Sequence, residues 1–126
     1  HGVLWVQSGP PNTVSVHANY TSAQTDTAIV TQAAGGKLVV TRVSVAADNA
    51  NTADVSVLIG FGTVNTPTTT GVVFAHPGIA SGLKFSDGDG SGILGMGTDD
   101  QDLRITSEVP TDGSIDVVVT YYVLPS

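Results

Sequence analysis

Apolar and polar residues alternate over two neighbouring stretches of the chain. The odd positions from Val39 to Val45 are apolar or Thr, whereas Arg42 and Ser44 lie between them. The run from Val55 to Phe61 repeats the alternation. A period of two is typical of a strand that packs one face on a core. Turn-forming residues separate the two runs: Asp48, Asn49, Ala50 and Asn51. The pattern therefore predicts a long antiparallel hairpin.

A second alternating pair lies at the end of the chain. Leu103, Ile105 and Ser107 alternate with their neighbours, and the odd positions of 115–123 do the same. Between them lies Pro-Thr-Asp-Gly at 110–113, in which Pro presets its φ and Gly is conformationally permissive. This arrangement predicts a second antiparallel hairpin.

Shorter strand-like runs complete the chain, and no stretch has a helical period. These runs are 3–6, 14–20, 27–31, 71–76 and 79–85. Short strands at this spacing, with turn residues between them, indicate a sandwich or barrel. We predict one all-β domain over 1–126, an antiparallel, jelly-roll-like β-sandwich of eight or nine strands. The segments Thr63–Thr70 and Ser86–Gly97 are rich in Thr, Pro, Gly and Asp, which predicts exposed loops.

The charge of the chain argues against two classes of partner. The sequence contains four Lys and Arg and eleven Asp and Glu, which gives a formal net charge of -7. This excess opposes attraction to nucleic acid or to an anionic membrane surface. No apolar run is long enough to span a bilayer, and the chain has no cysteine for a disulfide or a thiolate metal site. We expect a protein with neither nucleic acid nor membrane as a partner.

Five of the acidic residues fall close together near the end of the chain: Asp87, Asp89, Asp99, Asp100 and Asp102. Oxygen-rich loops of this kind hold hard cations, so calcium is the candidate ligand here, and we expect no cofactor beyond it. The segment 87–92 has no terminal Glu of an EF-hand loop. Asp-Gly pairs are also ordinary turn formers. Both interpretations stay open.

The histidines raise one further metal hypothesis. The chain begins His1-Gly2, as mature copper-dependent polysaccharide monooxygenases begin with His, and its other histidines are His17 and His76. His17 alternates with Val16 and Ala18 as a surface residue would. A copper oxygenase that uses His1 is therefore a remote alternative.

Catalytic patterns are not found in the sequence. It has no Gly-x-Ser-x-Gly elbow, and no Ser, His and Asp are joined by a motif. We therefore expect no enzyme activity. The aromatic residues Trp5, Tyr20, Tyr121 and Tyr122 suggest a sugar-stacking platform, although a small sandwich normally buries its aromatics. A glycan-binding, lectin-like module is the main alternative function.

The order of features from Lys37 to the C-terminus resembles small β-sandwich structural proteins of tailed bacteriophages. A Lys-led, Val-rich strand is followed by a hairpin that ends in Gly-Phe-Gly, a His-Pro-Gly loop and a final pair "DLRITSE" and "GSIDVVVTYYVL". The resemblance covers about two thirds of the chain. It implies a virion decoration or fibre-associated module, commonly homotrimeric, that binds capsid or tail proteins or host glycans. It implies no catalytic, metal or cofactor residue.

The alternation also predicts a surface for self-association. The positions opposite the regular apolar faces carry four apolar residues: Val40, Leu58, Val118 and Leu124. A lone sandwich of this size would leave them in water, and association would bury them. We expect a homotrimer.

Overall fold

The computed structural model describes residues 13–31, 36–63, 66–90, 92–99 and 101–125, with the backbone alone described for 63 and 66–70. These residues form nine strands and no helix. The strands are β1 (Val14–Tyr20), β2 (Gln24–Val30), β3 (Gly36–Ala47), β4 (Val55–Thr63), β5 (Thr66–Ile79), β6 (Lys84–Asp87), β7 (Gly95–Met96), β8 (Asp102–Ser107) and β9 (Ile115–Pro125).

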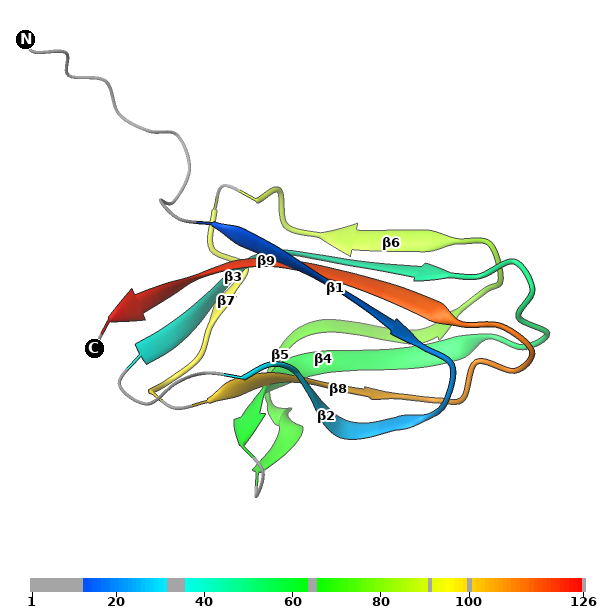
Figure 1. The fold of residues 1–126 in the computed structure, drawn as a ribbon, viewed down its shortest axis with the longest axis horizontal. Helices are drawn as coiled ribbons and strands as arrows, with labels where there is room; N and C mark the ends of the chain where they lie inside the picture. The colour runs from blue at the N-terminus through cyan, green and yellow to red at the C-terminus, as the bar shows by residue number, and fades with distance from the viewer. Residues whose placement is uncertain (1–12, 32–35, 64–65, 91, 100, 126) are drawn as a thin grey trace, which may run out of the picture.

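The strands form two antiparallel sheets that pack face to face (Figure 1). Sheet A has the order β1-β9-β3-β6, with β7 also paired to β3, and sheet B has the order β2-β8-β4-β5. One long antiparallel ribbon is formed by four sets of paired strands: β1 with β9, β2 with β8, β3 with β6 and β7, and β4 with β5. Pairs β3–β9 and β4–β8 then close the rolled ribbon. This is the topology of a jelly roll, and the predicted fold class is confirmed.

The two hairpins predicted from the sequence are wrong. β3 and β4 lie in different sheets, and so do β8 and β9, so each connection is a corner between the sheets. Alternation shows which face of a strand is buried, and it carries no information about which strand is the partner. Each sheet needs strands with one apolar face, and at these two connections the chain passes from one sheet to the other.

The two corners hold each other by hydrogen bonds. Asn51 is buried, and its Nδ2 donates to the backbone oxygen of Ser114 at 3.1 Å. The backbone N–H of Thr52 donates to the carbonyl of Thr111 at 3.0 Å. A side chain at Gly113 would collide with Asn51 Oδ1. Gly113 is therefore needed for space, while the positive φ of this corner, 66°, falls on Asp112.

The only tight hairpin between long strands in the described chain joins β4 to β5. Their register runs from Val55–Ile79 to Thr63–Thr66 with three irregularities, so the described residues of the predicted loop, 63 and 66–70, are strand. The ends of β4 and β5 near this turn lean away from the sandwich (Figure 1). The strands predicted at 14–20, 27–31 and 71–76 are confirmed in β1, β2 and β5.

Two other local predictions change. The expected strand 79–85 is broken, because Ile79 ends β5 and Lys84 begins β6. The expected loop 86–97 contains the end of β6 and all of β7. The run 3–6 lies outside the described residues.

The core lies between the sheets and is built from aliphatic side chains and two phenylalanines, Phe61 and Phe74. The alternation predicted for β4 and β9 is confirmed, with the odd positions of 55–61 and 115–119 buried. Val123 is 47% exposed, because β9 ends beyond the edge of the core. Val16, Tyr20 and Tyr121 pack against the same cluster from sheet A.

A β-bulge in β3 changes which residues of this strand face the core. Val40 pairs with Tyr121 and Arg42 with Thr120, so Thr41 is the extra residue. Before the bulge Leu38 and Val40 belong to the core cluster, and after it the odd positions 43–47 do. Without the bulge one of these sets would face outward, and each large side chain exposed in this way would cost about 1.5–3 kcal/mol of stability. One lost ladder hydrogen bond costs only about 1 kcal/mol, which favours the bulge.

The predicted association face is therefore not a single surface. Val40 is fully buried in the core, because the bulge turns it inward. Leu58 lies on sheet B, whereas Val118 and Leu124 lie on sheet A. The two exposed members, Val118 and Leu124, are 37% and 39% exposed.

The loop between β6 and β7 donates hydrogen bonds to the backbone carbonyls at the bulge. Gly90 N donates to the Thr41 carbonyl at 3.2 Å, and Leu94 N donates to the Val40 carbonyl at 2.8 Å. The Thr41 hydroxyl donates to the Thr120 carbonyl at 3.1 Å. Gly88 has a φ of +81°, and a side chain there would collide with the Thr41 carbonyl oxygen.

Substitution of Gly88 tests this close contact. Gly90 has a φ of +87° with nothing within 4 Å of an added Cβ, so Gly90→Ala should cost only the strain, about 1–2 kcal/mol. Gly88→Ala should lose a further ~1–3 kcal/mol because the collision adds to the strain. Urea unfolding of both variants measures the difference. Equal losses would show that the loop does not depend on the bulged carbonyl.

Candidate binding surface

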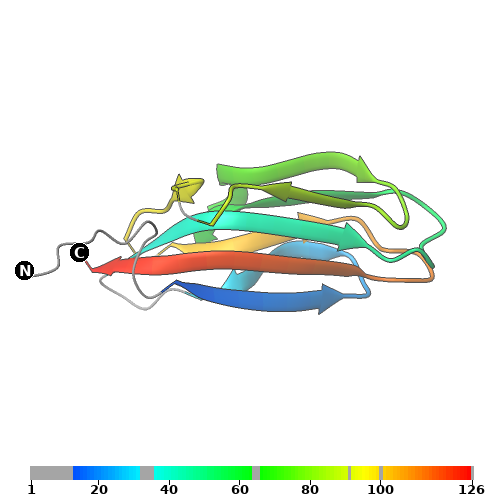
Figure 2. The same cartoon turned by 90° about the horizontal axis from the view of Figure 1, so that it is seen from above.

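The outer face of sheet A is hollowed by a trough. Its volume is about 280 Å³. The lining comes from β1, β9, β3 and β6, which lie side by side in Figure 2. The lining residues are Ser15, Arg42, Ser44, Ala46, Lys84, Asp116, Val118 and Thr120. We call this hollow the trough.

Small side chains at successive register positions make the trough possible. Ser44 on β3 lies opposite Val118 on one side and Ser86 on the other. Ala46 lies in the same way between Asp116 and Lys84. At these two positions the short side chains of β3 thus lie lower than Val118 and Asp116 on β9 and Lys84 on β6. Ser44 Oγ and Ser86 Oγ are 2.6 Å apart, which fixes the hydroxyl pair in place.

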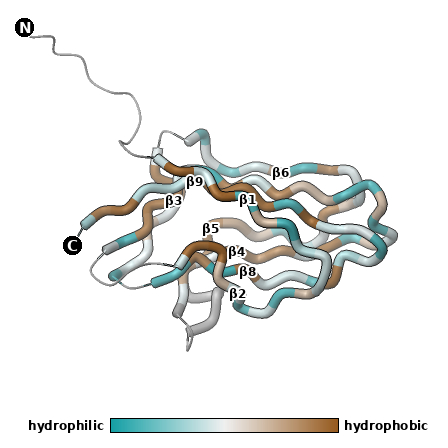
Figure 3. The backbone as a smooth tube through the Cα atoms, in the orientation of Figure 1, coloured by the Kyte–Doolittle hydropathy of each residue, from teal (hydrophilic) through white to brown (hydrophobic). Residues whose placement is uncertain are grey.

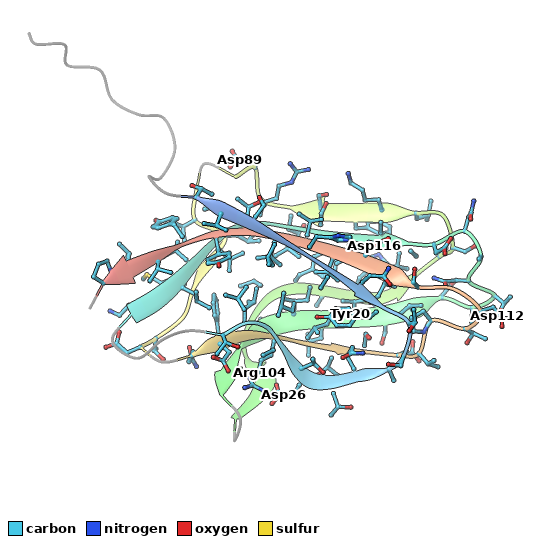
Figure 4. The ribbon with its side chains drawn as sticks, viewed as in Figure 1. Tyr20, Asp26, Asp89, Arg104, Asp112 and Asp116 are labelled. Carbon is cyan, nitrogen blue, oxygen red and sulfur yellow. The ribbon has the colours of Figure 1, made fainter. Side chains whose placement is uncertain are left out.

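One carboxylate of the trough is held in its charged form. His17 Nε2 and Asn19 Nδ2 contact Asp116 Oδ1 at 2.8 and 2.9 Å (Figure 4). The hydrogen bonds from Asn19 and His17, and the charge of His17, lower the pKa of Asp116, and partial burial opposes them only in part. Both bonds use Oδ1, so Oδ2 has no hydrogen-bond partner among the described residues. Asp116 therefore keeps a free acceptor at the trough.

The cations of the chain gather on this face. Only four Lys and Arg occur in the sequence, and Lys37, Arg42 and Lys84 all project from the outer face of sheet A. Within the described residues, neither Arg42 nor Lys84 has a hydrogen bond or an ion pair. The fourth cation, Arg104, lies on sheet B. In a chain with a net charge of -7, this face is the electropositive one.

The two ends of the sandwich differ in character. β1 begins and β9 ends at the same end of the sandwich (Figure 1), and parts of the tube there are coloured hydrophobic (Figure 3). Val14, Met96, Val123 and Leu124 at this end are 49%, 50%, 47% and 39% exposed. The register divides them between the two sides of sheet A. Met96, which pairs with Val39 beside Tyr122, and Leu124 lie on the outer side, whereas Val14, which pairs with Tyr121, and Val123 lie on the inner side at the edge of the core. We call these four residues, which share one end of the sheet, the apolar end. The opposite end carries acidic corner residues: Asp48, Asp54, Glu108 and Asp112.

The residues of the predicted calcium site fall on different elements. Asp87 ends β6, and Asp89 follows in the next loop, where its Oδ1 accepts a backbone N–H at 3.1 Å (Figure 4). Asp99 is exposed before β8, and Asp100 lies outside the described residues. Asp87 and Asp89 behave here as residues of a strand end and a turn.

Asp102, the fifth of these residues, is engaged by Arg104. Arg104 Nη2 donates to Asp102 Oδ2 at 2.6 Å, and Nη1 donates to the carbonyl of Asp26 at 2.8 Å (Figure 4). The two side chains are only 12% and 13% exposed. In the described ranges no three His, Asp or Glu side chains gather as a metal site would need. A calcium site that includes Asp100 stays a prediction.

The histidines and tyrosines that sequence analysis singled out do not meet in one site. His76 Nδ1 accepts the backbone N–H of Gly78 at 3.1 Å, and its ring lies 4.2 Å from that of Phe85. His17 binds Asp116 on another face, and His1 lies outside the described residues. The copper hypothesis therefore rests on His1 alone.

The expected aromatic platform is not formed by the tyrosines. Tyr20 and Tyr121 pack against the core, and burial raises the pKa of Tyr20. Tyr122 faces the other side of β9, and Trp5 lies outside the described residues. Sequence analysis did not predict the trough. Arg42 and Ser44 were visible as outward positions, but nothing in the sequence showed that β6 and β9 flank them.

Comparisons with known proteins identify the fold only. No family model and no curated protein matches the sequence. A structure of Bacillus endospore appendages, a family of disulfide-linked pili, is similar at TM-score 0.52 and 15% identity, covering 99% of this chain and 98% of that one. The chain thus shares the fold of that pilus protein.

Two further similarities are lower. A capsid structure of cyanophage Pam1 has TM-score 0.38 and 19% identity, over 96% of this chain and 94% of that one. The IMPa metallopeptidase of Pseudomonas aeruginosa has TM-score 0.35 and 22% identity, over 90% of this chain and 13% of that one. Neither adds to the fold assignment. The described residues include no helix that is long and apolar enough to cross a membrane.

Asp116 generates a prediction about pH. Its pKa is lowered in the folded state, so its contribution to stability is present above the unfolded pKa, near 3.8, and is lost as pH falls through the folded pKa. The difference in free energy of unfolding between the parent and Asn19→Ala should therefore shrink from pH 6 to pH 2. Carbon-detected NMR titration should show the pKa of Asp116 rising in Asn19→Ala. A pH-independent difference would show that Asn19 acts through packing alone.

Calcium titration tests the aspartates. A ligand that binds only the folded state raises its melting temperature by mass action. A site that includes Asp99 and Asp100 predicts a higher melting temperature in millimolar calcium than in excess chelator, and loss of that increase in Asp100→Asn. Superimposable melting curves would identify the aspartates as turn formers.

Proposed function

We propose that this protein is a structural component of a virion, which decorates or cements a capsid or belongs to a fibre or tail. It acts through noncovalent contacts with capsid or tail proteins and with copies of itself, as a homotrimer. It carries out no bond chemistry of its own. The proposal rests on the surface of the molecule, and above all on the apolar end.

The apolar end supports a protein partner. Four side chains there expose between 39% and 50% of their surface, two on each side of the end of sheet A. Exposed apolar side chains that gather at one end of a molecule favour protein contact there, because burial removes them from water. The chain has no cysteine, so such contacts depend on burial and complementarity.

The fold is compatible with this role. Jelly rolls recur in viral capsid proteins and in lectins, and a fold alone does not define a function. The pilus protein with the same fold belongs to a disulfide-linked assembly. An assembly of this chain would replace covalent links by apolar contact.

Light scattering tests both the oligomer and its interface. At micromolar concentration the parent should have three times the chain mass of 12.8 kDa. Met96→Asp combined with Leu124→Asp should give the monomer, because a carboxylate buried in an apolar contact is costly. The variant should also fail to sediment with particles, in which the parent should be a stoichiometric component.

Leu83→Asp is the matched control. Leu83 is 49% exposed, as the residues of the apolar end are, but it lies in the turn between β5 and β6. This variant should remain a trimer and keep its particle binding. A monomeric parent that does not sediment with particles would contradict the proposed function.

A further inference from the structure

We propose that the trough on sheet A binds one unit of an acidic saccharide, with its carboxylate held by Arg42 and Lys84 and its hydroxyls by Asp116. The inference goes beyond the proposed structural role. It uses a different surface from the apolar end, so either one can fail without the other.

Arg42 and Lys84 are the two cations that bind the carboxylate of the saccharide. Arg42 lies two residues before Ser44, and Lys84 lies two residues before Ser86, its cross-strand partner. The two cations therefore lie on opposite sides of the hydroxyl pair. Both line the trough, and neither has a partner among the described residues. A guanidinium with free N–H groups binds a carboxylate bidentately, which is the strongest hydrogen-bonding arrangement that this face offers.

Asp116 distinguishes a saccharide from a simple anion. It lies across the trough from Lys84 with only Ala46 between them, at two strand spacings or roughly 10 Å. It is charged at neutral pH, and the hydrogen bonds from Asn19 and His17 stabilise that charge, which repels a ligand that is anionic along its whole length, such as an acidic peptide. Its unpartnered Oδ2 accepts hydrogen bonds from hydroxyl donors. A ligand with a carboxylate at one end and hydroxyls at the other satisfies both sides.

The rest of the lining fits the same ligand. Ser15 and Thr120 contribute a second hydroxyl pair, with Oγ and Oγ1 3.0 Å apart. Val118 and Ala46 give an apolar floor for the C–H face of a sugar ring. The volume of about 280 Å³ is at the small end for ligand sites, of order 300 Å³, which limits the bound part to about one sugar unit.

Titration with trigalacturonate and 3′-sialyllactose, each against its methyl ester, tests the site. The esters keep the hydroxyls and remove the charge. We expect at least one acid to shift the backbone amide resonances of Ser44, Val118 and Thr120 in the parent, with affinity about tenfold above that of its ester. Arg42→Ala and Lys84→Ala should each weaken the acid to about the affinity of the ester. Lys37→Ala is the matched control, because Lys37 is a cation of the same face that does not line the trough, and its affinity should stay unchanged.

Asp116→Asn separates the saccharide from other anions. It should weaken both acid and ester, because an amide accepts hydroxyl bonds less strongly than a carboxylate. If Asp116→Asn instead strengthens binding, and a glutamate-rich peptide binds as well as the acids, the trough is a contact surface for acidic protein and the proposal fails. Absence of resonance shifts with both acids at millimolar concentration would also overturn it. Light scattering on Arg42→Ala should still give the trimer, so failure of the saccharide site leaves the structural role untouched.

Discussion

The long antiparallel ladder between β3 and β9 is the contact on which the rest of the structure depends. It joins the strand that begins at Gly36 to the strand that ends at Pro125, and it closes the rolled ribbon into two sheets. On its inner side it supplies Leu38, Val43 and Val117 to the core. On its outer side the same ladder aligns the floor of the trough. Because alternate residues of one strand face opposite sides, core and trough are set by one register.

The bulge at Thr41 reconciles this ladder with the sequence of β3. The apolar residues before and after it are out of phase, and the extra residue brings both sets to the core. The cost is a backbone carbonyl that the ladder no longer uses. The loop that begins at Gly88 supplies the missing donor from Gly90. The glycine-rich sequence of this loop thus has a structural role that does not require a metal.

The distribution of surface chemistry along the molecule keeps the two proposed tasks apart. The apolar end lies where β1 begins and β9 ends, whereas the row of Asp116, Ala46 and Lys84 lies near the opposite end of sheet A. A molecule attached through its apolar end would leave the trough in solvent. The acidic corner residues lie still further from that attachment, at the end where Asp112 is labelled in Figure 4. Attachment and recognition are therefore compatible in one small sandwich.

The sequence by itself determined the class of the fold, the approximate positions of most strands and the buried faces of β4 and β9. These follow from local alternation, because each residue's preference for core or solvent is visible without knowledge of its neighbours in space. The core residues of β3 change from even positions up to Val40 to odd positions from Val43. Both sets are apolar in the sequence, but alternation counted from Val39 misses the change. Tertiary structure alone decided the partners. It turned both expected hairpins into corners, placed Val40 in the core and set Arg42 and Lys84 on either side of a hydroxyl pair. Pairings between strands far apart in the chain depend on how the whole ribbon rolls, and that is a property of the complete core.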